Sequence, residues 1–537
     1  MSHESINPAR GVRGMVTAPH ALAAQSGLAV LREGGNAVEA MIAMAAGIAV
    51  LYPHMNSIGG DGFWLIARPG EAPLALDACG AAAVAVDPRT YRDAGLARIP
   101  FRGGSAAITV AGTLSGWQAA LQWSGSALGG RLPLTRLLAD AIDYARSGMP
   151  VTDSQSRCTQ EHAGELRDVQ GFAQAFLPRG EAPAAGTRFR QPRMADTLEQ
   201  LARAGLHDFY DGDLARNVAR DLAAAGSPLS LADLQRHRAE WKVPLALAHS
   251  RGTVWNMPPP TQGLVSLLIL GQLDRLLDAG VTDSLGAAYV HACVEATKEA
   301  FAVRDGHITD PAYMTGDPQR WLDPAVLDGM ADGIRRRNVA RWPGGVGPAD
   351  TVWMGAIDAQ GVAVSFIQSI YHEFGSGIVL PESGINWQNR GCSFSLDPGT
   401  LNPLMPGRKP FHTLNPAMAR LSDGRLMVYG NMGGDGQPQS QSAVFTRIVH
   451  FGMNPAAAIA APRWLLGRTW GQESESLKLE SRFPPATVEA LRRRGHGVDL
   501  LADYDETMGH AGAVVRDADG LLEGSSDPRS DGAAAGW

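Results

Sequence analysis

The feature that most constrains this chain is a predicted β-hairpin that is apolar on both faces. Residues 352–357 and 362–369 have strand patterns, and the Asp and Gly of the intervening segment 358–361 suit a tight turn. The alternating side chains of the first strand are Val352, Met354 and Ala356 on one face and Trp353 and Ile357 on the other. A strand that is apolar on both sides must be covered on both sides. The hairpin therefore predicts a layered body with the order helix, sheet, sheet, helix.

The first of these strands begins directly after a Gly- and Pro-rich segment, residues 344–350. A flexible connection that leads a hydroxyl residue, Thr351, onto a stiff strand is typical of a self-cleaving hydrolase precursor. Inside a chain a Thr hydroxyl has no base beside it, but at a new N-terminus it gains an α-amine with a pKa of about 7.7–8.0, which accepts a proton near neutral pH. Because Thr also favours strands, a purely structural role for Thr351 stays open.

The rest of the chain alternates between helical and strand patterns. A helix pair is predicted at 20–33 and 38–51, where Gly34 and Gly35 end the first helix and Asn36 caps the second. Residues 110–245 have mainly helical patterns. Further helices are predicted at 263–277, 287–304, 440–451 and 486–495, and further strands at 57–66, 426–429, 476–479 and 512–515. The apolar run 40–52 is too short to span a bilayer and is interpreted as part of an amphipathic helix.

Composition excludes several classes of function. With 537 residues, 45% of them hydrophobic, the chain can bury a large core. A formal net charge of −7 and no basic run argue against nucleic acid as a partner. The four cysteines, Cys79, Cys158, Cys293 and Cys392, lack CxxC spacing, and the chain begins without a secretory signal pattern. His372 and Glu373 lack the second His of a zinc-protease motif, so no metal is expected. We expect a soluble cytoplasmic protein with no membrane partner.

A series of motifs resembles the γ-glutamyltransferase (γ-glutamyltranspeptidase) family, in the family's order and over nearly the whole chain. The motifs are Gly34-Gly35-Asn36-Ala37-Val38, Gly59-Gly60-Asp61-Gly62-Phe63, Met257-Pro258-Pro259-Pro260 with Thr261-Gln262-Gly263, Thr351 to Asp358, Phe374-Gly375-Ser376-Gly377-Ile378, Glu382-Ser383-Gly384-Ile385, Gly433-Gly434, Ala461-Pro462-Arg463 and Ser526-Asp527-Pro528-Arg529-Ser530.

The resemblance implies an α+β fold, the four-layer αββα sandwich of N-terminal nucleophile hydrolases, with no cofactor. It implies cleavage between Asp350 and Thr351, giving a large subunit, 1–350, and a small subunit, 351–537. Ser369 takes the place of a second hydroxyl that bonds the nucleophile. The amides of Gly433 and Gly434 would form the oxyanion hole, where aimed N–H groups stabilise a developing alkoxide. An ordinary strand-to-helix turn is the alternative for the two glycines.

The chain departs from the family in the residues that would hold a γ-glutamyl group. Where the family has an Arg for the α-carboxylate, this chain has Leu76-Asp77-Ala78-Cys79-Gly80. The acidic pair for the α-amino group falls on Arg390 and Ser393. The paired serines fall on His412 and Thr413, and an Asn falls on Tyr371. A cation in place of an anion favours a substrate carboxylate near the scissile amide. The implied substrate is a small acid amide bound by Arg390, Tyr371, His412 and Thr413.

The tract 367–377 resembles the oxamate amidohydrolase-like branch of the family, which acts in purine degradation. We therefore expect a zymogen whose two subunits form an amidohydrolase that cleaves an oxamate-like amide through an N-terminal Thr ester. Alternatives are a γ-glutamyl transferase or hydrolase, a glutaryl (cephalosporin-type) acylase, and an uncleaved binding protein. Arg390 as a structural ion-pair residue, and His412 and Tyr371 as packing residues, also stay open. So does assembly into a dimer of heterodimers.

Overall fold

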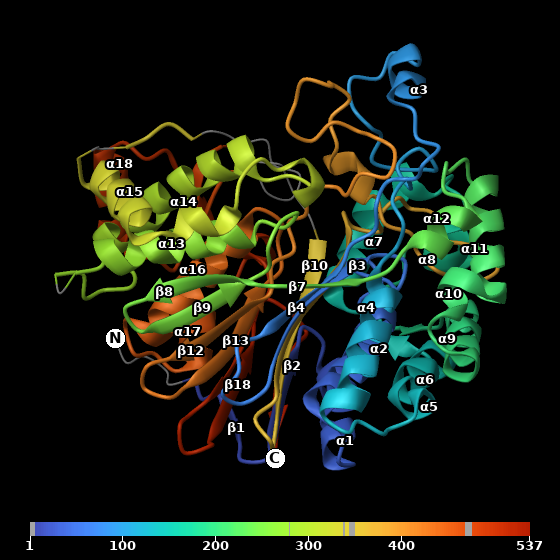
Figure 1. Cartoon of the computed structure of the whole chain (residues 1–537), viewed down its shortest axis with the longest axis horizontal. Helices are drawn as coiled ribbons and strands as arrows, with labels where there is room; N and C mark the ends of the chain where they lie inside the picture. The colour runs from blue at the N-terminus through green and yellow to red at the C-terminus, as the bar shows by residue number, and fades with distance from the viewer. Residues whose placement is uncertain (1–5, 279, 337–338, 343–349, 468–474) are drawn as a thin grey trace.

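Two seven-stranded sheets, each hydrogen-bonded in antiparallel fashion, lie face to face at the centre of the computed structural model (Figure 1). The structure describes residues 6–278, 280–336, 339–342, 350–467 and 475–537. The first sheet has the order β1 (Ala9–Gly11), β18 (Leu522–Ser526), β17 (Ala511–Arg516), β13 (Leu426–Asn431), β12 (Ala417–Leu421), β9 (Gly252–Asn256), β8 (Leu245–His249). The second has the order β19 (Ala533–Gly536), β2 (Gly14–Ala18), β10 (Asp350–Asp358), β11 (Ala363–Tyr371), β3 (Asp61–Ala67), β4 (Leu74–Ala78), β7 (Glu240–Lys242).

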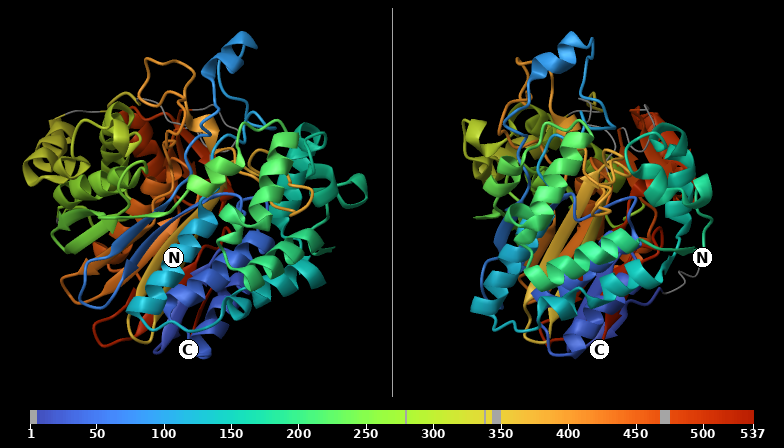
Figure 2. Two further views of the ribbon diagram at one scale, coloured as in Figure 1. Left: turned by 45° about the vertical axis from the view of Figure 1, so that its right-hand side comes forward. Right: turned by 90° about the vertical axis from the view of Figure 1, so that its right-hand side faces the viewer.

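Helices cover the outer face of each sheet (Figures 1 and 2). The second sheet is covered by α1 (Ala21–Arg32), α2 (Ala37–Leu51) and α4 (Thr113–Ala127). The first sheet is covered by α13 (Gly263–Leu276), α16 (Gly436–Val449) and α17 (Pro455–Ala460), with α14 (Ala287–His307) and α15 (Pro324–Arg336) packed outside α13. This is the αββα sandwich that the sequence predicts.

Several of the remaining elements pack on the outside of the helical layers. The other helices are α3 (Pro88–Asp93), α5 (Leu134–Leu137), α6 (Ala139–Ser147), α7 (Asp153–Leu166), α8 (Phe172–Phe176), α9 (Pro192–Ala204), α10 (Asp208–Asp211), α11 (Asp213–Ala224), α12 (Leu231–Arg236) and α18 (Pro485–Arg494). Two small sheets contain β5 (Met149–Pro150) with β6 (Arg188–Phe189), and β14 (Trp464–Leu466) with β15 (Leu477–Glu480) and β16 (Val498–Leu501).

The predicted hairpin is confirmed as β10 and β11, at the centre of the second sheet. Trp353 and Ile357 point into the core between the two sheets. Val352, Met354 and Ala356 point into the core between the second sheet and its helices. Both faces of the hairpin are thus buried, as its sequence requires. The Gly- and Pro-rich segment before Thr351 falls largely on residues 343–349, which lie outside the described residues.

The helix pair α1 and α2 is also confirmed, with one correction. Asn36 caps α2 through a capping box, in which its Oδ1 accepts from Val38 N and Glu39 N while Glu39 Oε2 accepts from Asn36 N at 2.9 Å. The expectation of an amphipathic helix was wrong, because every residue of α2 is buried. One side of the helix contacts the second sheet, and its other sides contact the helices α1, α4, α5 and α6. It therefore has no solvent face.

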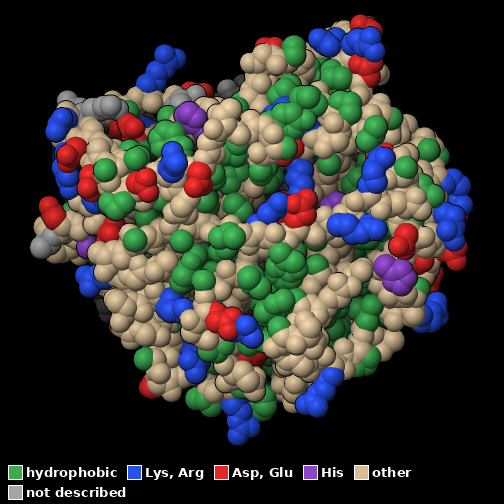
Figure 3. Space-filling model, viewed as in Figure 1, with side chains coloured by type: hydrophobic (Ala, Val, Ile, Leu, Met, Phe, Trp, Pro, Cys, Tyr) green, Lys and Arg blue, Asp and Glu red, His purple; other side chains and the backbone are tan. Residues whose placement is uncertain are grey.

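Each sheet combines strands from both sides of Asp350. In the second sheet β10 pairs with β2 on one side and with β11 on the other, and β11 pairs with β3. Within the described residues, no helix combines the length and the apolar character needed to cross a bilayer. On the face shown in Figure 3, acidic and basic side chains are interspersed, in keeping with the modest net charge.

Candidate active site

Thr351 lies at the second position of β10, and its side chain is fully buried. Gln437, in the first turn of α16, donates from Nε2 to Thr351 Oγ1 at 3.5 Å. The candidate nucleophile therefore sits where the second sheet meets the N-terminal end of a helix that covers the first sheet. Cleavage of the bond between Asp350 and Thr351 stays a prediction.

Ser369 lies beside Thr351 at an irregularity in the pairing of β10 with β11. Asp350 pairs with Tyr371 and Val352 pairs with Gln368, so that Thr351 alone opposes both Ser369 and Ile370. Such a bulge re-aims side chains and is common next to active sites. Ser369 Oγ accepts from Tyr371 N at 2.8 Å. The structure thus brings the two predicted hydroxyl residues to the same point of the sheet.

Gly433 and Gly434 form the turn between β13 and α16, one turn of helix away from Gln437. Their φ angles are +115° and +48°, which glycine adopts without strain. Gly433 O accepts from Gly436 N at 2.7 Å, and Gly434 O accepts from Gln262 Nε2 at 2.7 Å. Among the described residues, neither N–H of the pair donates to a protein acceptor. This leaves both N–H groups able to donate a hydrogen bond to a substrate oxyanion.

Arg390 is a buried cation with unused donors. It begins a short 3₁₀ turn, Arg390–Ser393, and is 1% exposed. Its Nη1 donates to Thr413 Oγ1 at 3.4 Å, and its guanidinium lies 3.8 Å from the centroid of the Tyr371 ring. Its Nε and Nη2 are buried and have no hydrogen-bond partner among the described residues. Because a buried charge is costly unless it is paired, this arrangement favours a bound anion.

His412 lies next to this cation and is held by Asp61. This acidic residue belongs to the Gly59–Phe63 motif but was not predicted as a site residue. His412 Nε2 lies 3.1 Å from Asp61 Oδ2, and both side chains are fully buried. Asp61 Oδ1 accepts from Gly80 N, Gly112 N and Gln388 Nε2 at 3.0–3.1 Å. Burial lowers the pKa of His412 well below its usual value, an effect that Arg390 strengthens, so the imidazole is neutral. His412 Nδ1 has no partner among the described residues.

Tyr371 connects the hydroxyl pair to Arg390. Its backbone N binds Ser369 while its ring lies against the guanidinium. Its φ of +84° is rare for a bulky residue and costs free energy, as strained residues at functional sites do. Burial raises the pKa of Tyr371 to about 12, so the phenol stays protonated near neutral pH. All four predicted substrate residues, Arg390, Tyr371, His412 and Thr413, therefore form one cluster.

Two of the departures from the family pattern, at residues 76–80 and at Ser393, have clear structural consequences. Cys79 is buried, and a Cβ at Gly80 would lie 1.6 Å from Val110 O, so no arginine fits at Gly80. Ser393 Oγ donates to Arg390 O at 3.0 Å and thus closes its own turn.

Two groups of described residues have donor atoms close enough together to hold a metal ion. They are Asp61, Cys79 and His412, and His291, Glu295 and His496. In the first group burial raises the pKa of the Cys79 thiol well above its usual value, and Arg390 adds positive charge nearby. In the second, Glu295 already binds Lys298 Nζ at 2.7 Å and Ala340 N at 2.8 Å. We assign neither group as a metal centre.

Asp61 supplies a prediction about pH. Burial raises its pKa to about 7, against the opposing effects of Gly80 N–H and Arg390, whereas an unfolded Asp has a pKa of about 3.9. Between about pH 4 and about pH 7 the folded state then binds one more proton than the unfolded state, so the Asp61 contribution to the free energy of unfolding should fall as pH rises.

The comparison with Asp61→Asn, which does not titrate, isolates this effect. The thermal unfolding midpoint of wild type minus that of the variant should be larger at about pH 5 than at about pH 8. An equal difference at both pH values would mean that Asp61 stays ionised in the folded protein.

Comparison with known proteins shows which family the chain belongs to. The family model for gamma-glutamyltranspeptidase matches residues 23–537. The chain is 59% identical over 524 residues to the oxamate amidohydrolase proenzyme of Klebsiella pneumoniae, covering 98% of each chain. It is 41% identical to the glutathione hydrolase-like YwrD proenzyme of Bacillus subtilis, covering 98% of this chain and 99% of that one. The cephalosporin acylase from Bacillus halodurans superposes with a TM-score of 0.91 at 33% identity, covering 100% of this chain and 98% of the other. The chain therefore belongs to the gamma-glutamyltranspeptidase family of N-terminal nucleophile hydrolases.

Proposed function

We propose that the protein is a self-processing amidohydrolase that converts oxamate, or a closely similar small acid amide, to the diacid and ammonia. The observation that carries the proposal is the buried Arg390, two of whose nitrogens have no hydrogen-bond partner among the described residues, in a chain 59% identical to an oxamate amidohydrolase proenzyme. Oxamate has its carboxylate directly next to the scissile amide, and guanidinium donors match a carboxylate well.

Self-cleavage between Asp350 and Thr351 would generate the enzyme, with residues 1–350 and 351–537 as its two subunits. The names of the Klebsiella pneumoniae and Bacillus subtilis relatives, both proenzymes, support such a precursor. The step frees the Thr351 α-amine, which has the right pKa range to serve as a base beside its own hydroxyl.

The reaction then proceeds in two halves. The α-amine takes the proton from Thr351 Oγ1, and the oxygen attacks the amide carbon. The N–H groups of Gly433 and Gly434 stabilise the negative charge on the carbonyl oxygen. The α-ammonium gives its proton to the amide nitrogen, the C–N bond breaks, and ammonia leaves an ester on Thr351. Water then attacks this ester with the same amine as base, releasing the acid and the Thr351 hydroxyl.

Arg390, Thr413 and Tyr371 would bind the substrate. The Arg390 Nε and Nη2 atoms offer two N–H groups to the carboxylate, and Thr413 Oγ1, which accepts from Arg390, keeps its own proton for donation. Ser369 would hold the nucleophile in place from the neighbouring strand. His412 would contact the substrate through Nδ1, in the orientation that Asp61 sets.

A second candidate is an acylase for larger amides, which the similarity to the cephalosporin acylase supports. The two functions differ in what must surround the scissile bond. An acylase needs a pocket with room for a long acyl chain, whereas an enzyme for oxamate needs only a cation that binds the substrate carboxylate. Hydrolysis of oxamate, glutamine, glutathione and glutaryl amides, measured side by side as release of the ammonia or amine leaving group of each, separates them.

We expect oxamate to be the best of these substrates and γ-glutamyl compounds to be poor ones. The α-ammonium of a γ-glutamyl group would meet Arg390 instead of an acidic pair, so charge pairing is lost and repulsion is added. The measurement is the rate of γ-glutamyl transfer to glycylglycine beside the rate of oxamate hydrolysis. Efficient transfer with no oxamate hydrolysis would contradict the proposal.

A further inference from the structure

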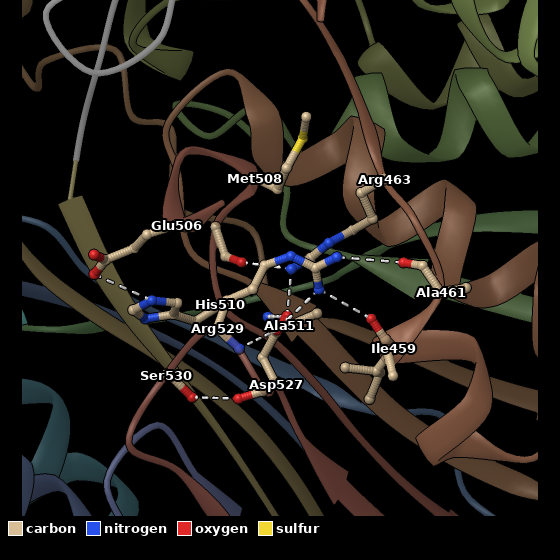
Figure 4. A network of polar contacts seen from close by, with 12 residues as sticks. Ile459, Ala461, Arg463, Glu506, Met508, His510, Ala511, Asp527, Arg529 and Ser530 are labelled. Atoms are coloured by element: carbon tan, nitrogen blue, oxygen red, sulfur yellow. Dashed lines mark hydrogen bonds and ion pairs between the residues drawn. The ribbon is translucent and has the colours of Figure 1, made fainter. Parts of the chain in front are cut away.

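A buried network of ion pairs surrounds Asp527, and Figure 4 shows Arg463 and Arg529 beside it. Arg463 binds Asp527, and Arg529 binds both Asp527 Oδ1 at 3.0 Å and Glu480 Oε1 at 2.6 Å. All four side chains are fully or almost fully buried. Arg482 also binds Glu480 from the less buried side of the network, so three cations surround two anions. The network joins the motifs at 461–463 and 526–530, to which the proposed reaction gives no role.

Arg463 reaches from this network to the strand that leads into the turn. Its Nη1 donates to Asn431 Oδ1 at 2.9 Å, and its Nη2 donates to Gly509 O at 2.6 Å. Asn431 is the last residue of β13 and is fully buried. A guanidinium has donors only, so it dictates that the oxygen of the Asn431 amide faces Arg463 and that the nitrogen faces the other way.

The nitrogen of that amide donates to the carbonyl oxygen of Met432. The peptide unit between Met432 and Gly433 is planar, so its carbonyl oxygen and the N–H of Gly433 point in opposite directions. Holding the Met432 oxygen therefore aims the Gly433 N–H. Met432 N donates to His510 O at 3.0 Å, which holds the preceding peptide as well.

The Gly433 peptide needs such a restraint. Gly433 has φ of +115°, and a Cβ there would find its nearest described neighbour, Gly509 Cα, at 3.7 Å, so side-chain packing does not lock the turn. Glycine costs little to rotate, and a peptide that flips would turn the N–H away from the oxyanion. The restraint must come from hydrogen bonds on the carbonyl side.

We propose that Arg463, acting through the side-chain amide of Asn431, is a positioning residue that aims the Gly433 N–H at the oxyanion. This inference rests on the proposed oxyanion role of Gly433. Neither Arg463 nor Asn431 touches the substrate in this account. Their effect is confined to the state in which negative charge has developed on the carbonyl oxygen.

Asn431→Asp tests this directly, because it keeps the size and the oxygen that faces Arg463 but replaces the donor to Met432 with a second oxygen. Loss of one oxyanion donor typically lowers kcat by about 10²- to 10³-fold, so partial misorientation should lower kcat on oxamate by roughly 10- to 100-fold. KM, and inhibition by the product oxalate, should stay within about threefold, because Arg390 is untouched. Asn454→Asp is the matched control, since Asn454 caps α17 and aspartate caps equally well.

Arg463→Lys is the second variant, for the case in which Asn431→Asp does not accumulate as folded protein. A lysine keeps the charge beside Asp527 but loses the planar fork, so kcat should fall with KM unchanged. If wild-type protein does not hydrolyse oxamate, the proposed function is refuted, and the same comparison of kcat and KM is made on whichever amide of the panel wild type hydrolyses. Wild-type kcat in either variant, or a rise in KM that accounts for the whole loss in kcat/KM, would overturn the positioning role.

Discussion

Thr351→Ala should leave the 56.8 kDa chain as a single band on a denaturing gel and should abolish amide hydrolysis. Alanine has no hydroxyl to attack a carbonyl, either in the chain itself or in a substrate. Wild-type protein should instead resolve into a larger and a smaller fragment, and N-terminal sequencing of the smaller one should read Thr-Val-Trp-Met.

Two comparisons make this result specific to the nucleophile. Thr400→Ala removes the hydroxyl of an exposed loop threonine and should be cleaved and active as wild type is. The thermal unfolding midpoint of purified Thr351→Ala should show that it is folded. A Thr351→Ala protein that is still cleaved after Asp350 would contradict the assignment of Thr351 as the nucleophile.

Arg390→Ala should lower kcat/KM on oxamate by about 10- to 100-fold or more, while self-cleavage proceeds normally. A charge-assisted pair of hydrogen bonds contributes roughly 1.5–3 kcal/mol, and self-cleavage needs only Thr351 and its own backbone. Arg390→Lys should recover part of the loss, because an ammonium keeps the positive charge but lacks the planar pair of N–H donors that a guanidinium offers to a carboxylate. Steady-state kinetics on oxamate and on oxamide, which has no carboxylate, measure the effect.

The loss should be confined to the acid amide. Arg408→Ala is a matched control, since Arg408 is also buried but has partners in Thr309 Oγ1 at 2.7 Å and Leu401 O at 2.8 Å. It should change stability more than it changes the preference for oxamate over oxamide. If Arg390→Ala keeps that preference, or does not fold, Arg390 is structural, and the substrate class must be reconsidered from His412 and Thr413.

Local patterns were enough to predict the central elements of the fold. The α2 cap at Asn36 and the β10–β11 hairpin depend on neighbours in sequence and on alternation, both of which can be read from a short window. The two apolar faces of β10 were enough to infer two covering layers. The full burial of α2 was not predicted, because it depends on which distant helices pack around it.

The candidate site divides in the same way. The resemblance of motifs singled out Thr351, Ser369 and Gly433-Gly434, and substitutions at fixed places in those motifs singled out Arg390, which the structure then brings close to Tyr371 and Thr413. It did not reveal that Asp61 holds His412, or that Gln437 reaches Thr351. These contacts join residues more than 80 positions apart, and no local spacing encodes them.

By itself, then, the sequence determined the layered architecture and the strand that carries Thr351. Both follow from hydrophobic periodicity. Only the tertiary structure decided that Arg390 is buried with two nitrogens that lack a partner within the described part of the chain, and that Arg463 binds Asn431 next to the Gly433 turn. Burial and hydrogen-bond partners depend on how segments far apart in the chain pack together, so they arise only when the two sheets close on each other.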